Sequence, residues 1–136
     1  MSNNDDIRWR QRLENYEKAV AELREACGQK EYNKLERAGL IQLFELTFEL
    51  GWKTLQDILA YEGQAVGGAR TALREVHRLE LISDIDGWIA MLEVRNRLTH
   101  AYDEKAVLAT VNVILENYQF LLERLMRDLR AWRERE

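Results

Sequence analysis

Residues 95–102 bring together the side-chain types that phosphodiester chemistry needs: they read Arg-Asn-Arg-Leu-Thr-His-Ala-Tyr. Arg95 presents several N–H donors in a planar fork that suits the non-bridging oxygens of a phosphate. His100 is of the residue type best matched to proton transfer near neutral pH. This pair predicts a site that holds a phosphodiester and moves a proton at its attacking or leaving oxygen.

The same stretch interrupts an apolar helical face. Trp88 and Leu92 recur at helical spacing, and the same rhythm then reaches Arg95 and Tyr102, with Asn96 one position round the helix. Burying such polar groups is costly unless they are paired or line a wet cleft. We therefore interpret this face as functional. An alternative is that Arg95 and His100 are polar groups satisfied within the core of a structural dimer.

A single regular helix does not bring Arg95 and His100 together. Five residues of α-helix separate two side chains by roughly 140° around the axis. The two groups are therefore expected to converge either where the helix ends or across a symmetric interface between two copies of the chain.

Other chemistries lack their parts in this sequence. Two histidines and the single Cys27 have no zinc-ligand spacing, so we expect no metal site, and Cys27 is expected to be a small buried apolar group. Neither a phosphate-binding Gly-x4-Gly-Lys-Ser/Thr loop nor a Gly-x-Ser-x-Gly elbow is present. We expect no cofactor, and His77 is expected to be structural.

The composition predicts one all-α domain over residues 1–136. The chain is 46% apolar and has no proline, which favours long helices. No apolar run approaches the ~20 residues of a membrane span, so no membrane role is expected. A lone thiol and the absence of a signal-like N-terminus favour a cytoplasmic location. The net charge of −4 argues against a general polyanion binder, although four arginines at positions 124–133 form a basic edge.

Hydrophobic periodicity predicts an up-and-down four-helix bundle with one extra short helix. The expected helices are Asp5–Cys27, Lys34–Tyr61, Ala69–Leu79, Asp86–His100 and Glu104–Arg133. Asn33 followed by Glu36 predicts a capping box at the second helix, and Asp103 is expected to cap the last one. At about 45 Å the last helix is longer than the bundle needs, so part of its apolar surface is expected to meet another subunit.

The helix over 34–61 is apolar around most of its circumference and is expected to be central. Its polar residues form one narrow stripe that includes Glu45, Glu49 and Lys53. Two interpretations stay open. The stripe is either the one solvent-facing edge of the helix, or it faces Arg95, where a carboxylate would offset the guanidinium and support a cleft.

The chain resembles the HEPN superfamily. More narrowly, it is similar to the nucleotidyltransferase substrate-binding or HepT-like proteins that are encoded beside a minimal nucleotidyltransferase. The resemblance rests on residues 95–102, on Phe44-Glu45 and on the stretch 48–55, Phe-Glu-Leu-Gly-Trp-Lys-Thr-Leu. It extends over nearly the whole chain. Ala101 stands where the family often has threonine, and glycines 67 and 68 stand where it often has proline.

The resemblance implies a homodimeric helical bundle in which Arg95 and His100 of both chains line an interface cleft. It also implies the toxin half of a toxin–antitoxin pair, acting as a metal-independent ribonuclease on RNA. His100 would serve in acid–base catalysis, Arg95 in charge stabilisation and Asn96 in positioning. The partner nucleotidyltransferase would attach AMP to Tyr102, placing a bulky anionic group at the cleft.

Two other functions remain open beside the ribonuclease. The chain could be the non-catalytic subunit of a two-chain nucleotidyltransferase, with the same cleft holding a nucleotide. It could also be a purely structural dimer. It lacks the Gly-Ser signature of the transferase, so it is not expected to transfer nucleotides by itself.

Overall fold

The computed structural model describes residues 3–98 and 103–136, and within these ranges the regular structure is entirely helical. The elements are α1 (Asn3–Ala26), α2 (Lys34–Tyr61), α3 (Ala69–Arg78), α4 (Ile85–Leu98), α5 (Glu104–Val113), a π-helical segment (Ile114–Tyr118) and α6 (Gln119–Arg135). The predicted all-α class is confirmed, and α2 has the predicted bounds. None of the described helices is both long and apolar enough to cross a bilayer.

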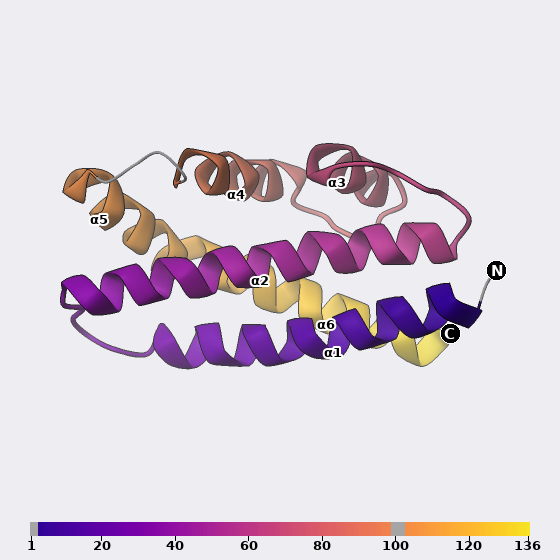
Figure 1. Ribbon diagram of the computed structural model, residues 1–136, viewed down its shortest axis with the longest axis horizontal. Coiled ribbons are helices and arrows are strands. Elements are labelled where there is room, and N and C mark those ends of the chain that lie inside the picture. The colour runs from indigo at the N-terminus through magenta and orange to yellow at the C-terminus, as the bar shows by residue number, and fades with distance from the viewer. Residues whose placement is uncertain (1–2, 99–102) are drawn as a thin grey trace.

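The helices form an up-and-down bundle in which α2 is the central element (Figure 1). α1 and α2 run antiparallel along the length of the molecule, α3 and α4 together make the third leg, and α5 leads into α6 on the way back. α2 contacts α1, α3, α4, α5 and α6. Because its apolar side chains surround most of the helix, neighbours on several sides are needed to bury them. α1 begins and α6 ends at the same end of the bundle.

Local sequence signals set where the helices begin. The Asn33 side chain accepts from the Glu36 N–H at 2.8 Å, while the Glu36 carboxylate accepts from the Asn33 N–H at 2.9 Å. This is the predicted capping box, which satisfies two backbone donors at the start of α2. The Asp103 carboxylate accepts from the Lys105 N–H at 3.1 Å and caps α5, also as predicted.

The last helix differs from the regular α-helix that the periodicity predicts. It continues without a break from Glu104 to Arg135 but widens into a π-helical segment over Ile114–Tyr118. Ile114, Tyr118 and Leu122 follow one another at steps of four residues, which in an α-helix would drift about 80° around the axis. With the wider π turn all three side chains are buried. The Tyr118 ring stacks on the Phe44 ring, with 5.4 Å between the ring centres.

Three of the four arginines of the basic edge near the C-terminus form ion pairs within the chain. Arg130 and Arg133 both pair with Glu17 of α1, at 2.5 and 2.8 Å, and Arg127 pairs with Glu123 at 2.7 Å. Partial burial raises the pKa of Glu17, but the hydrogen bonds and charges of the two arginines outweigh it and hold the pKa below its usual value. Arg130 and Arg133 therefore join α6 to α1, whereas the Arg127 pair lies within α6.

Cys27 is only partly buried, and it packs against the core just after α1 rather than lying fully inside it. Burial nevertheless raises the pKa of its thiol to about 11, although the charge of Arg24 opposes the shift. The thiol is therefore protonated at neutral pH, consistent with a packing role rather than a reactive one.

Two glycines within α2 differ in their surroundings and supply a matched pair of stability tests. A Cβ at Gly51 would lie 3.0 Å from a ring carbon of Tyr16, whereas a Cβ at Gly39 would meet nothing within 4 Å. Tyr16 cannot move aside easily, because it is fully buried and its hydroxyl donates to the Leu122 carbonyl at 2.6 Å.

We expect Gly51→Ala to destabilise the fold by about 1–3 kcal/mol through overpacking. Gly39→Ala should stabilise it by up to about 1 kcal/mol, because alanine restricts the unfolded chain and favours helix. Urea unfolding followed by circular dichroism measures both changes. Equal effects of the two substitutions would contradict the close contact between α1 and α2 at Gly51.

Candidate functional site

Arg95 lies in the last turn of α4 and reaches across to α2. Its Nη1 is 2.8 Å from Oε2 of Glu49, and the guanidinium carbon lies 5.7 Å from the centre of the Phe48 ring. The Arg95 side chain retains 26% of its exposure. Two interpretations of the polar stripe on α2 were open. At Glu49 the stripe faces Arg95 rather than only solvent.

The Glu49 carboxylate accepts from three groups. Besides Arg95, it accepts from Nε1 of Trp52 at 3.0 Å and pairs through Oε1 with Nζ of Lys53 at 3.1 Å. Partial burial raises the pKa of Glu49. The hydrogen bonds from Trp52 and Lys53 and the charge of Arg95 outweigh that effect, so the pKa lies below its usual value. The carboxylate therefore remains ionised and holds the guanidinium in place.

The cluster formed by Arg95, Glu49 and Lys53 carries surplus positive charge. Two cations and one carboxylate leave a net charge of one positive at a position that solvent still reaches. Nε of Arg95 is buried and has no hydrogen-bond partner among the residues that the structure describes. Such an arrangement can bind an anion, because the guanidinium is oriented by one carboxylate without being neutralised by it.

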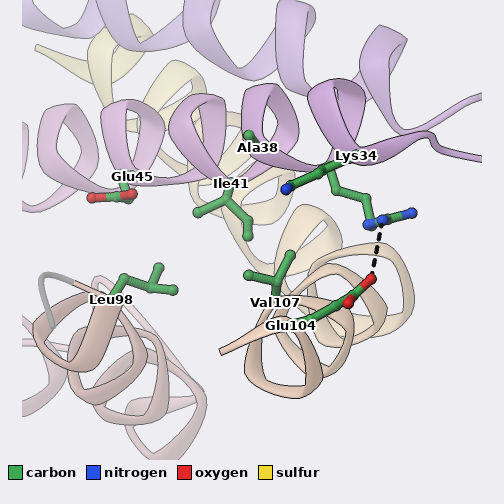
Figure 2. A pocket seen from close by; sticks show the side chains of 8 residues that line it. Lys34, Ala38, Ile41, Glu45, Leu98, Glu104 and Val107 are labelled. Carbon is green, nitrogen blue, oxygen red and sulfur yellow. Dashed lines mark ion pairs between the residues drawn. The ribbon is translucent and has the colours of Figure 1, made fainter. Parts of the chain in front are cut away.

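Glu45 lies one turn before Glu49 on α2 and does not join this cluster. It borders a groove of about 480 Å³ between α2 and the facing ends of α4 and α5 (Figure 2). On the α2 side the groove is lined by Lys34, Arg37, Ala38, Ile41 and Glu45, and on the opposite side by Leu98, Glu104 and Val107. The stripe thus divides into Glu49, which binds Arg95 and Lys53, and Glu45, which lines the groove.

The remaining predicted site residues lie beyond α4 or on its surface. Asn96 is exposed on α4. His100 and Tyr102 fall within 99–102, outside the residues that the structure describes, so the predicted convergence of Arg95 and His100 stays a prediction. Among the described residues, no group of three or more histidine, cysteine or carboxylate side chains could hold a metal ion.

Sequence reasoning missed two kinds of contact at this site. Trp52 supplies a donor to Glu49, and its signal was available because residues three apart share a helix face. The groove residues Lys34 and Arg37 had no comparable signal. Their position opposite Val107 depends on how α5 packs against α2, and periodicity along one helix carries no information about that distance.

The comparison with known families decides the class of this bundle. Residues 11–131 match the model of the family described as "Nucleotidyltransferase substrate binding protein like". The chain belongs to this family. The match extends from the first helix to the last and includes α2 and α4, which carry Glu49 and Arg95.

Two proteins of known sequence or structure are similar to this family member. A Haemophilus influenzae protein named "Probable ribonuclease HepT" is 36% identical over 96 residues, which cover 65% of this chain and 66% of the relative, just under two thirds of its length. A crystal structure of a Thermus thermophilus protein shares 30% identity at a TM-score of 0.78, covering 85% of this chain and 98% of that one. The helical bundle is therefore a fold seen in a solved structure.

The cluster of Arg95, Glu49 and Lys53 predicts a pH-dependent contribution to the free energy of unfolding. Because the folded-state pKa of Glu49 is lowered, its stabilising effect is fully present above the usual carboxyl range and is lost as pH falls through the lowered value. We expect Glu49→Gln to reduce the unfolding free energy at neutral pH by about 1 kcal/mol, a value discounted for partial exposure. The difference in unfolding free energy between Glu49→Gln and wild type should disappear at strongly acidic pH, where Glu49 is protonated.

Denaturant unfolding at several pH values measures this difference. Glu45→Gln is the matched control, because Glu45 lies on the same helix without an ion pair in the described part of the chain. A Glu49→Gln effect that is absent, or that stays constant with pH, would contradict the assigned ion pair.

Proposed function

We propose that this chain is the toxin component of a HEPN/minimal-nucleotidyltransferase toxin–antitoxin pair and acts as a metal-independent endoribonuclease. The observation that carries the proposal is the Arg95 guanidinium, held by Glu49 at a partly exposed position with a net positive charge. The similarity to a relative named as a ribonuclease supports the same reaction class. RNA is the substrate, and the cytoplasm is the proposed location.

The reaction proposed for the site is an internal transfer at phosphorus. The ribose 2′-hydroxyl attacks the adjacent phosphate, and the bond from phosphorus to the 5′-oxygen breaks. His100 takes part in moving the proton off the 2′-hydroxyl and onto the departing 5′-oxygen, leaving a 2′,3′-cyclic phosphate and a 5′-hydroxyl. Arg95 stabilises the negative charge that develops on the non-bridging oxygens, and Asn96 positions the substrate.

A homodimer is part of the proposal, because a second copy would bring another Arg95 and His100 to the same cleft. Several large apolar side chains remain exposed on the monomer and are available to a partner. Leu35 is 81% exposed, while Leu46 and Leu108 retain about half of their surface. The second partner proposed is the minimal nucleotidyltransferase, which would bind this chain as its substrate.

Regulation is proposed to act through Tyr102. The phenol oxygen would attack the α-phosphate of ATP in the partner transferase, releasing pyrophosphate and a proton and leaving AMP on the tyrosine. Tyr102 follows His100 by two residues, so an added phosphate would lie near the proposed catalytic group and oppose an RNA phosphate by charge.

A second candidate function is a non-catalytic nucleotide-binding subunit of a two-chain nucleotidyltransferase. The groove of about 480 Å³ favours it, because this volume could hold a nucleotide and Lys34 and Arg37 line one end. The description of the family points in the same direction. In this case the chain would bind nucleotide without cutting RNA.

Removing either proposed catalytic side chain should abolish RNA cleavage. We expect Arg95→Ala and His100→Ala each to lower the cleavage rate by about 10²–10⁴-fold in the presence of a metal chelator, with the helical fold retained. Gel analysis of a labelled RNA measures the rate. Arg74→Ala, an exposed arginine of α3, is the control and should cleave normally. Wild-type rates from both site variants would refute the ribonuclease assignment.

Co-expression with the neighbouring nucleotidyltransferase should add one adenylyl group to the chain. Peptide mass spectrometry should place it on Tyr102, because that phenol is the proposed nucleophile, and Tyr102→Phe should remain unmodified. RNA cleavage by the modified protein should be lost. An adduct on a different tyrosine, or none at all, would remove the regulatory part of the proposal.

A further inference from the structure

The groove beside Arg95 continues along α2 for several helical turns. Glu45 lies one turn from Glu49 on α2, and Leu98 lies one turn after Arg95 on α4, so the groove begins next to the Arg95 cluster. Lys34 lies fifteen residues before Glu49, which corresponds to about 22 Å along the helix. A ligand longer than a single phosphate can therefore extend from Arg95 toward the start of α2.

The groove changes in character along its length (Figure 2). Glu45 and Leu98 lie at the end nearest Arg95, Ile41 and Val107 face each other in the middle, and Lys34 lies at the far end. The acidic end at Glu45 and the far end, where Glu104 lies beside Lys34 and Arg37, are thus separated by apolar side chains. This arrangement suits a molecule that is itself partly apolar and partly anionic.

The far end of the groove places two cationic side chains, Lys34 and Arg37, beside the carboxylate of Glu104. Nη1 of Arg37 donates to the Tyr32 carbonyl at 2.6 Å, and Nη2 lies 3.8 Å from Glu104, whose side chain is 78% exposed. Nε of Arg37 is buried and has no partner among the described residues, as is also true of Nε of Arg95, so a ligand would meet the outer Nη atoms of Arg37. Lys34 is exposed and forms no ion pair within the described part of the chain.

We propose that this groove is a nucleotide subsite that holds single-stranded RNA next to the phosphate bound by Arg95. A base lies against Ile41, Leu98 and Val107, and the following phosphate lies between Lys34 and Arg37. The inference rests on the proposed ribonuclease function and adds a binding path to it. A duplex does not fit this role, because its bases are stacked and paired and cannot turn into a groove.

Glu45 gives the subsite a preference among bases. A carboxylate repels phosphate but accepts a hydrogen bond from an exocyclic amino group, as acidic side chains do with the amino group of cytosine. Adenine, cytosine and guanine carry such a group, and uracil does not. The subsite therefore favours amino-bearing bases over uracil at the position next to the cut.

Binding and cleavage are measured separately so that the two proposals can fail independently. RNA affinity is measured with the His100→Ala variant, which should leave RNA intact. Fluorescence anisotropy follows the binding of three labelled ligands: a hexaadenylate, a hexauridylate and a diadenylate. The expected results are tighter binding of the hexanucleotide than of the dinucleotide, and of adenylate than of uridylate.

In the His100→Ala background, Lys34→Ala should weaken hexanucleotide binding roughly tenfold. It should also lower the slope of log affinity against log salt concentration by about one, because one fewer counterion is released. Dinucleotide binding should change little, because that ligand does not reach Lys34. Lys18→Ala, an exposed lysine of α1, is the matched control and should leave both unchanged. Glu45→Gln should reduce the preference for adenylate without abolishing binding.

Ile41→Arg tests the apolar wall and separates the possible occupants. Blocked hexanucleotide binding at an unchanged sedimentation coefficient supports the subsite. A variant that instead changes the oligomeric state identifies the groove as a contact between copies and overturns the proposal. If free AMP binds as tightly as the hexanucleotide, the proposal is also overturned, because the groove then holds a single nucleotide rather than an RNA strand.

The cleavage assay separates this inference from the ribonuclease proposal. If wild-type protein cuts RNA while Lys34→Ala and Ile41→Arg bind the hexanucleotide normally, the subsite is wrong and the ribonuclease function stands. If wild-type protein neither binds nor cuts RNA, the ribonuclease function itself fails, and the subsite fails with it.

Discussion

The contact between Glu49 and Arg95 ties the end of α4 to the central helix, and the candidate site depends on it. An arginine side chain that is three-quarters covered needs a compensating charge, and Oε2 of Glu49 supplies it at 2.8 Å from Nη1 of Arg95. Trp52 and Lys53 in turn keep Glu49 ionised and oriented. Because three donors share one carboxylate, the cluster can fix the direction of Arg95 and still retain a net positive charge for an anionic ligand.

α2 makes this arrangement rigid, because one helix carries both the ion-pair partner and the long wall of the groove. It contacts every other α-helix of the bundle, so its side chains cannot shift without disturbing several interfaces. Glu49, Glu45 and Lys34 therefore keep constant spacing along a stiff rod. A substrate that binds along α2 would meet a preformed sequence of charged, apolar and charged surfaces, with little conformational cost on the protein side.

Some features were predictable because they depend on residues close together in the chain. The capping box at Asn33 and the start of α5 after Asp103 involve contacts within three residues. The widened turn at 114–118 was missed, although two successive steps of four in the apolar stripe carried its signal. Periodicity alone predicts a regular α-helix there, whereas the wider turn accompanies the burial of Tyr118 against Phe44.

The sequence by itself determined the helical class, the central place of α2 and the anomaly of a polar stretch after an apolar face, because these follow from local propensity and periodicity. The sequence left open whether the polar stripe of α2 faces solvent or Arg95. Only the tertiary structure decided that Glu49 meets Arg95, 46 residues away, while Glu45 lines a groove. That choice depends on how α4 and α5 pack across α2, and the energies of long-range packing have no signature within a single helix.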